Sequence, residues 1–461
     1  MSLITFDEFD LGLDLRKASS VSDANRLRRL DNAYVTTGKS IRKRPGMVKV
    51  ATLEAGTKGL AAGNGKLNTF YTSGTITHAN ALFTANKLTK ASGNTTLKSI
   101  PFVDVFNGFL YVAAIYADDS CRHHYVDGTA TNEVADVKCP HSPIVAKKAS
   151  KIWSSGGDVV RFTKTSTPRD WTTANDAGFL PVGLNQAGTK TVTALGEYNA
   201  QLVVFFSDSA QVWNVDPDPL KNSFAQGIDI GVRHPYTHDN MAGDVIFLSA
   251  QGIRSTALQA QTQNLIDIDV GSPIDKVVFS ELPVGITPRG IYWRGGGQYW
   301  LYAGNVAWVY SFSRTAKISA WSKYILTYPI DDLTELDNVL YIRSGDDVYR
   351  MDAAAYTDNG NVFSVDIETQ FLDFKLPGVL KQILAMDAAF TGTGSVAHRY
   401  DPRDPSLITS PPVPITGDTR AGRTLPVELI TPNISIVINN KDASEFEVSL
   451  LSYLFENLGV W

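Results

Sequence analysis

Cysteine is scarce in this 461-residue chain, which has only Cys121 and Cys139, and two cysteines cannot supply a disulfide framework. Long apolar runs are missing as well, since no stretch of about 18 apolar residues predicts a membrane span. The first residues, MSLITFDEFDLGLDLR, carry acidic side chains where a secretory signal has positive charge and then an apolar segment. We therefore expect a protein that is not exported by that route and stays where it is made until assembly or lysis.

An excess of positive charge is also missing. The chain has 42 Lys and Arg against 47 Asp and Glu, which gives a net charge of −5. This balance argues against a protein whose main role is to wrap nucleic acid, although it leaves room for a local basic patch. The hydrophobic content of 43% is that of a globular protein with a large core.

Helical periodicity is rare, and one pattern recurs instead: a turn rich in Gly, Asn or Asp, a short aromatic and β-branched strand, a second turn and a second strand. Such patterns predict β-hairpins. Neighbouring hairpins are separated by 41 to 53 residues, close to the length of about 40–50 residues expected for propeller blades. The seven hairpins are residues 63–71, 106–116, 149–164, 197–215, 242–258, 295–312 and 336–352.

The pattern predicts an all-β fold whose main part is an irregular β-propeller of about six or seven blades. In a propeller each blade buries both faces against its neighbours and leaves few open edges. The alternative is a set of unrelated hairpins in two sandwiches, because the spacing is irregular and no WD or kelch signature is present. We expect an extended N-terminal arm over residues 1–50, a propeller over 51–360 and a C-terminal β-rich, sandwich-like domain over 361–461.

The C-terminal domain is predicted from a change of pattern after about residue 360. Alternating strands are expected in residues 362–374 and 427–440, on either side of a proline-rich loop at 401–418. The chain closes with SLLSYLFENLGVW, whose apolar side chains must be covered by the protein's own core or by a partner.

Residues 29–50, RLDNAYVTTGKSIRKRPGMVKV, contain a GKS triplet and the strongest cluster of positive charge. A nucleotide-binding Walker A loop requires a glycine five positions before its Gly-Lys pair, where this chain has Ala33. Nucleotide binding is therefore not expected. The cluster could contact a phosphate backbone, dock on an acidic partner or lie solvated, and the candidates for a partner or DNA contact are Arg42, Lys43 and Arg44.

The sequence CRHHY with CPH places two thiols and three imidazoles within 21 residues. Zinc uses such ligands, so Cys121, His123, Cys139 and His141 are weak metal candidates. Their spacing matches no standard finger or ribbon, and a disulfide between the two cysteines or an unliganded polar loop are the alternatives. No metal or other cofactor is expected.

Catalytic motifs do not stand out. The chain has no G-x-S-x-G elbow and no H-E-x-x-H helix. Asp104, Asp208, Asp244 and Glu335 could serve a propeller glycosidase, but such residues more often cap strands or form turns. The tryptophans lie inside strand patterns, which favours core packing over sugar stacking. We expect no catalytic residues.

Several stretches resemble the tail nozzle proteins of short-tailed bacteriophages, also called tail hub or packaged-DNA stabilisation proteins. The opening resembles that family in having Asn32, then Gly38, then the Lys43-Arg44-Pro45-Gly46 turn. Further similarity lies in SKIWSSGGDVVRFTKTSTPRDWTT, in FAQGIDIGVRHP and in FLDFKLPGVLKQILAMD. The order of these pieces covers most of the chain, although none is a strict motif.

The resemblance implies a structural virion protein without catalytic residues. Six copies would form a ring below the portal and its adaptor, extend the channel through which double-stranded DNA leaves, help to retain the packaged genome, and anchor fibres, tailspikes or a needle. The protein would be assembled in the host cytoplasm. Two other functions are kept open: a propeller that binds or hydrolyses glycans, and a generic scaffold that binds other proteins.

Overall fold

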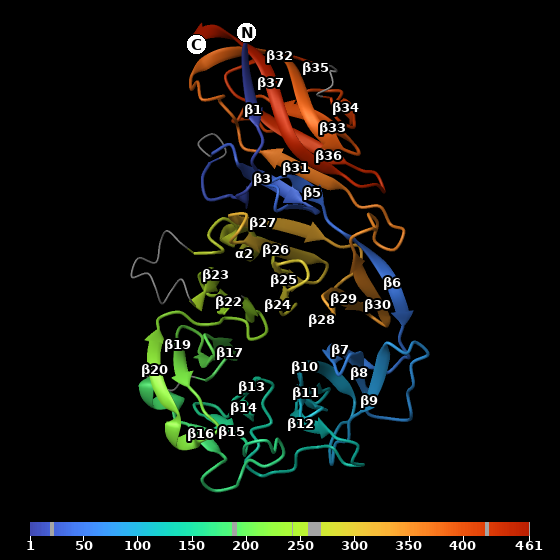
Figure 1. The fold of residues 1–461 in the computed structure, drawn as a ribbon, viewed down its shortest axis with the longest axis vertical. Coiled ribbons are helices and arrows are strands. Elements are labelled where there is room, and N and C mark those ends of the chain that lie inside the picture. The colour runs from blue at the N-terminus through green and yellow to red at the C-terminus, as the bar shows by residue number, and fades with distance from the viewer. Residues whose placement is uncertain (19–22, 187–190, 242, 257–268, 420–423, 461) are drawn as a thin grey trace.

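The computed structural model describes residues 1–18, 23–186, 191–241, 243–256, 269–419 and 424–460, which form a ring of small sheets with a sandwich of longer strands at one side (Figure 1). Helix is rare in this part of the chain and includes η1 (Val182–Asn185), η2 (Pro219–Lys221) and α2 (Asp275–Glu281). No helix among these residues is long and apolar enough to cross a membrane.

The first half of the ring consists of four sheets, here called blades 1 to 4. Blade 1 contains β7 (Lys58–Gly63), β8 (Lys66–Tyr71) and β9 (Phe83–Lys87), and blade 2 contains β10 (Leu97–Phe106), β11 (Phe109–Tyr116) and β12 (Cys121–Val126). Blade 3 contains β13 (Val145–Lys148), β14 (Lys151–Ser155), β15 (Val160–Phe162) and β16 (Gly178–Leu180). Blade 4 contains β17 (Ala194–Tyr198), β18 (Gln201–Phe205), β19 (Ala210–Asn214) and β20 (Ser223–Ile228).

Three further blades complete the ring within the described residues. Blade 5 contains β21 (Asp239–Met241), β22 (Asp244–Ser249) and β23 (Gly252–Ser255). Blade 6 contains β24 (Arg289–Trp293), β25 (Gln298–Ala303), β26 (Val306–Ser313) and β27 (Ile318–Ile325). Blade 7 contains β28 (Asp332–Leu336), β29 (Val339–Ser344), β30 (Asp347–Asp352) and, from the other end of the chain, β6 (Gly46–Thr52).

The blades follow from strands that are buried on both faces. Along β25, Tyr299 and Leu301 enter the core shared with blade 5, whereas Trp300 and Tyr302 enter the core shared with blade 7. Alternate residues of a strand point to opposite faces, so a strand between two neighbours must be apolar throughout. The same alternation occurs in β18, and the predicted hairpins correspond to such central strands.

Separate apolar cores fill the spaces between successive blades and close the ring. Blades 1 and 2, 2 and 3, 3 and 4, and 4 and 5 each share one core, and further cores join blade 5 to 6, 6 to 7 and 7 to 1. The fold is therefore an all-β propeller with seven blades in the described chain, and the fold class predicted from the hairpins is confirmed.

The ring is closed by β6, which pairs antiparallel with β30 from Asp347 opposite Thr52 to Asp352 opposite Gly46. Arg343 of β29 also stabilises the contact between blade 7 and blade 1. Its guanidinium is buried and donates to the carbonyl oxygens of Gly59 at 2.8 Å and Thr57 at 2.7 Å, where blade 1 begins. The first propeller strand and the last three thus form one sheet.

The remaining strands build a two-layer sandwich beside blade 6. One layer has the order β35 (Leu425–Thr431), β32 (Val379–Thr391), β37 (Glu447–Val460), β5 (Ile41–Lys43) and β4 (Ala33–Val35), with β1 (Ser2–Phe6) also on β37. The other continues the sheet of blade 6 through β2 (Gly12–Leu13), β3 (Arg26–Asp31), β31 (Val365–Thr369), β36 (Ser435–Asn440), β33 (Thr393–Arg399) and β34 (Val413–Thr416).

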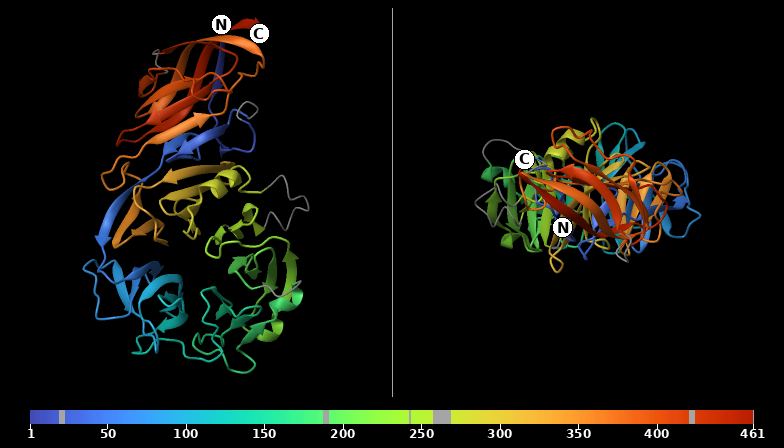
Figure 2. Two further views of the ribbon diagram at one scale, coloured as in Figure 1. Left: turned by 180° about the vertical axis from the view of Figure 1, so that it is seen from behind. Right: turned by 90° about the horizontal axis from the view of Figure 1, so that it is seen from above.

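Residues 1–45 therefore do not form the extended arm expected from the sequence. They supply strands to both layers of the sandwich: β3 and β5 lie next to the propeller, whereas β1 runs along β37 to the far end of the sandwich (Figure 2). The first part of the apolar C-terminal segment is covered by the protein's own core, because Leu451, Tyr453 and Phe455 of β37 are buried in it. Leu458 is 49% exposed, and Trp461 lies outside the described residues.

Candidate functional site

The basic segment Arg42-Lys43-Arg44 lies where the sandwich meets the propeller. Arg44 is fully buried, and both of its terminal nitrogens bind the Asp358 carboxylate, at 2.9 and 2.7 Å. Its Nε donates to Asn32 Oδ1 at 3.0 Å, and the terminal nitrogens also donate to the carbonyl oxygens of Pro45 and Ile325. All the donor nitrogens of the guanidinium are thus satisfied inside the protein, which is what a buried arginine requires.

Lys43 is also buried, and both cations lie close to the ring of Phe363. The centre of this ring is 3.7 Å from the Arg44 guanidinium carbon and 4.6 Å from Lys43 Nζ. Lys43 Nζ donates to Asn440 Oδ1 at 3.0 Å and to the Asp442 carbonyl oxygen at 2.5 Å. Burial, helped by the Arg44 charge, lowers the pKa of Lys43 to about 8.

The residues around this pair explain the rest of the motif. Asn32 adopts a left-handed conformation with φ of 55°, and its side chain links Arg44 to the Ile325 amide and the Ser364 carbonyl. Gly46 packs so closely on the chain that a Cβ there would lie 2.2 Å from the Thr357 carbonyl oxygen. The segment therefore needs Asn, Arg and Gly at these positions to join the two parts of the molecule.

This corrects the choice of Lys43 and Arg44 as candidates for a partner or DNA contact. Lys43 and Arg44 are 1% and 0% exposed, and their charges are already matched by groups of the same chain. Arg42 is the exception, with a side chain 38% exposed that pairs with Glu445 and Glu447 at the surface. Of the three candidates, only Arg42 is placed to meet another molecule.

Two of the cysteine and histidine candidates, Cys121 and His123, lie on β12 of blade 2. The other two, Cys139 and His141, lie in the segment that connects β12 to β13. Cys121, His123 and Cys139 are buried, and His141 is half-buried. His123 Nε2 donates to the Ser142 carbonyl at 2.7 Å, and its Nδ1 accepts from the Tyr111 hydroxyl at 2.8 Å. Cys139 Sγ lies 3.4 Å from that same Nδ1. Burial raises the pKa of both Cys121 and Cys139 to about 12, so both stay protonated thiols. Among the described residues, no three His, Cys, Asp or Glu side chains are grouped so as to hold a metal ion.

These histidines are expected to make the fold sensitive to acid. Burial lowers the pKa of His123 to about 3 and that of His124 to about 4, below the ordinary value of 6.5. As the pH falls below 6.5, these two histidines become protonated in the unfolded chain but stay neutral in the folded one. The free energy of unfolding should therefore decrease.

His124→Gln provides the test. The variant should be less stable at pH 7, because His124 is hydrogen-bonded to Tyr116 and Asn132. Its free energy of unfolding in urea should nevertheless decrease less than that of the unsubstituted protein between pH 6.5 and 4. Equal slopes in the two proteins would show that His124 takes up its proton in the folded state.

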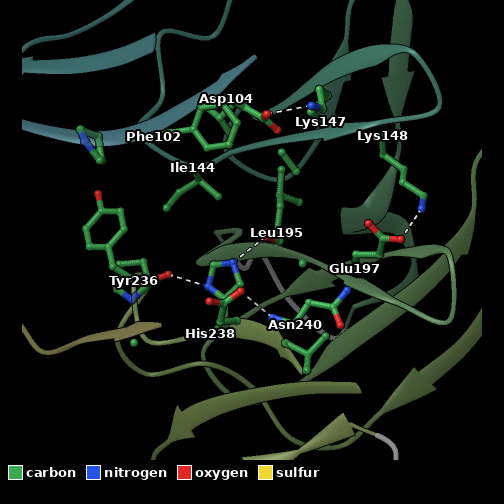
Figure 3. A pocket seen from close by; sticks show the side chains of 18 of the residues that line it. Phe102, Asp104, Ile144, Lys147, Lys148, Leu195, Glu197, Tyr236, His238 and Asn240 are labelled. Atoms are coloured by element: carbon green, nitrogen blue, oxygen red, sulfur yellow. Dashed lines mark hydrogen bonds and ion pairs between the residues drawn. The ribbon is translucent and has the colours of Figure 1, made fainter. Parts of the chain in front are cut away.

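The axis of the propeller holds a cavity of about 580 Å³ that the sequence did not single out (Figure 3). Six of the seven blades contribute to its wall. The lining includes Val103 of β10, Ala146 of β13, Gly196 of β17, Asn240 of β21, Gly290 of β24 and Leu333 of β28. These are the innermost strands, which precede the predicted hairpins and have weaker sequence patterns.

Two ion pairs lie in the wall of this cavity. Lys147 Nζ lies 2.7 Å from Asp104 Oδ1, and Lys148 Nζ lies 2.6 Å from Glu197 Oε1 (Figure 3). Lys147 also donates to the Val105 carbonyl oxygen at 2.8 Å. The charges in this part of the wall therefore cancel in adjacent pairs. Asp104 is the one carboxylate candidate of the sequence that lines the cavity.

A histidine joins two blades beside these pairs. His238 Nε2 lies 2.7 Å from the Leu195 carbonyl oxygen of blade 4, and Nδ1 lies 2.9 Å from the Pro235 carbonyl oxygen. Burial lowers the pKa of His238 and raises that of neighbouring Asp239, which accepts from the Tyr292 amide. This cluster fixes the position of β21 at the cavity.

Two polar side chains at the cavity have no hydrogen-bond partner in the described chain. The Tyr236 hydroxyl makes no such bond, although the Arg289 guanidinium lies 5.6 Å from the centre of its ring. The side-chain amide of Asn240 is also free of hydrogen bonds. Six tryptophans were predicted to pack in the core, and none of them lines this cavity. Trp153, Trp213, Trp300, Trp308 and Trp321 are buried, whereas Trp293 at the end of β24 is only half-buried.

Comparison with known proteins adds little. No protein-family model and no curated protein matches the chain. Among solved structures, the chain is similar to the Pan2 WD40 domain of Neurospora crassa, with 8% identity and a TM-score of 0.32 over 70% of this chain and 88% of that one. It is also similar to Hsv2 of Kluyveromyces lactis, with 13% identity and a TM-score of 0.33 over 53% and 70%. Similarity this low carries no functional information.

Proposed function

We propose that the protein is a structural subunit of the tail nozzle of a short-tailed bacteriophage. The observation that carries the proposal is the joint at residues 32–46. The stretch that carries much of the resemblance to the nozzle family also joins the sandwich to the propeller through the ion pair of Arg44 and Asp358. A channel wall under the pressure of a packaged genome requires such a rigid subunit, and the hydrogen-bonded sheet that continues from blade 6 into the sandwich supports this rigidity.

In this proposal six copies form a closed ring below the portal and adaptor. Closed rotational symmetry limits assembly to a ring of fixed size and leaves an axial passage for DNA. The mildly acidic composition suits that passage, since strong phosphate binding along the wall would slow the exit of the genome. Fibres, tailspikes or a needle would attach to the outside or the lower rim.

Particles produced without this protein test the proposal. We expect electron microscopy to show tails that end below the adaptor, together with heads that have lost their DNA. Supplying the protein from a plasmid should restore both features. Filled heads on complete tails would refute the nozzle function and leave the glycan-binding and scaffold alternatives.

A further inference from the structure

The axial cavity has the size of a small-molecule site. Its volume of about 580 Å³ lies within the range of roughly 300–1,000 Å³ typical of ligand pockets. Each of the surrounding strands β10, β13, β17 and β21 pairs with one neighbour only among the described strands. Their free edges face the axis, so backbone N–H and C=O groups alternate around the cavity and need partners there.

The charges at the cavity do not favour an ionic ligand. Asp104 is neutralised by Lys147, and Glu197 by Lys148, both through direct contacts. A charged ligand that paired with one of these four side chains would have to compete with its present partner, a modest cost because the side chains are 19–45% exposed. A neutral ligand with many donors and acceptors meets no such cost.

Free polar groups and an aromatic ring line the same space. The Tyr236 hydroxyl and the Asn240 amide are available for hydrogen bonds, and Figure 3 shows both residues at the cavity together with the Phe102 ring. A hydroxyl group donates one hydrogen bond and accepts two, so it suits both the amide and the strand edges. The ring faces suit the apolar C–H faces of a cyclic polyol.

From these observations we propose that the axial cavity binds a neutral, hydroxyl-rich small molecule of the size of a mono- or disaccharide. Tyr236 and Asn240 donate and accept the orienting hydrogen bonds, and the Phe102 ring packs against the ligand. This binding function goes beyond the nozzle role and does not depend on it, since it concerns the inside of one subunit and not the channel of the ring.

Saturation-transfer NMR on the full-length protein tests the site with D-glucose, D-galactose, D-mannose, N-acetylglucosamine and maltose as probes. Glucosamine and glucuronate serve as charged counterparts. At least one neutral sugar should receive saturation and bind more tightly than both charged sugars. Tyr236→Phe, which keeps the ring, should weaken that binding by about two- to tenfold, as should Asn240→Leu.

Tyr292→Phe is the matched control, because this β24 tyrosine also lacks a hydroxyl hydrogen bond among the described residues but does not line the cavity. It should bind the sugar as the unsubstituted protein does. Thermal unfolding of each variant checks that the fold is kept, and the near-isosteric Tyr236→Phe remains informative if Asn240→Leu unfolds. Tighter binding of a charged sugar, equal binding by Tyr236→Phe, or no binding of any neutral probe would overturn the proposal.

Discussion

Replacing Arg44 with methionine should lower the free energy of unfolding by about 3–5 kcal/mol, because it leaves the Asp358 carboxylate buried without its counter-ion. Both side chains are 0% exposed, and Asp358 retains only the Thr327 amide and hydroxyl as donors. Urea unfolding followed by tryptophan fluorescence measures the change. Arg42→Met, two residues earlier in the same basic segment, is the matched control and should cost at most about 1 kcal/mol, since its ion pairs lie at the surface.

The double variant Arg44→Met, Asp358→Leu tests whether the loss of stability in Arg44→Met comes from the unpaired Asp358 charge or from the loss of packing at Arg44. Apolar replacement of both partners removes the unpaired charge, so the double variant should be more stable than Arg44→Met alone. Full recovery is not expected, because the Asn32 side chain and the Thr327 amide lose their partners. If the double variant were less stable than the single one, the Asp358 charge would not be the source of the loss.

A chain that begins at residue 53 should not fold at all. It lacks β6, the outer strand of blade 7, whose Met47 is fully buried between blades 6 and 7. It also lacks the sandwich strands β3, β4 and β5 and exposes the large core that they cover. Circular dichroism and thermal unfolding of the purified chain measure the loss. A chain lacking only residues 1–6 is the control and should remain folded, because most side chains of β1 are exposed.

A circular permutant shows whether the missing strands or their place in the sequence is responsible. The two ends of the chain lie side by side, with Ser2 opposite Phe455 in adjacent strands (Figure 1). Residues 53–461 followed by a flexible linker of about eight residues and then residues 1–52 restore every strand. This permutant should regain the cooperative thermal transition. A folded truncation, or an unfolded permutant, would contradict the proposed closure of blade 7.

The propeller was predictable from the sequence because its signals are local. The turn at Asn107 and Gly108, with positive φ at both residues, joins two apolar strands over a few positions. Such hairpins form the middle of each blade. The expected strands at 362–374 and 427–440 likewise overlap β31, β35 and β36 of the sandwich.

The basic joint and the cavity were not predictable, because both depend on partners that are distant in the sequence. A cluster of arginines is usually exposed. The sequence around Arg44 contains no signal that this residue is buried and paired with Asp358. The cavity is built from short inner strands of six blades, whose residues have no shared motif. Tyr236 and Asn240 become candidate ligand contacts only because the folded chain places both of them at the cavity.

The interleaved ends constrain the order in which the chain can fold during synthesis. Blade 7 cannot be completed until β30 has left the ribosome, although its partner β6 emerges about 300 residues earlier, at Gly46–Thr52. The sandwich waits longer still, since β1 and β5 pair with β37 at the end of the chain. Contacts of such high sequence separation slow folding and leave strand edges unpaired in the meantime. The first fifty residues of the nascent chain must therefore stay without their native strand partners until translation is nearly complete. This makes them the segment most in need of protection by a chaperone.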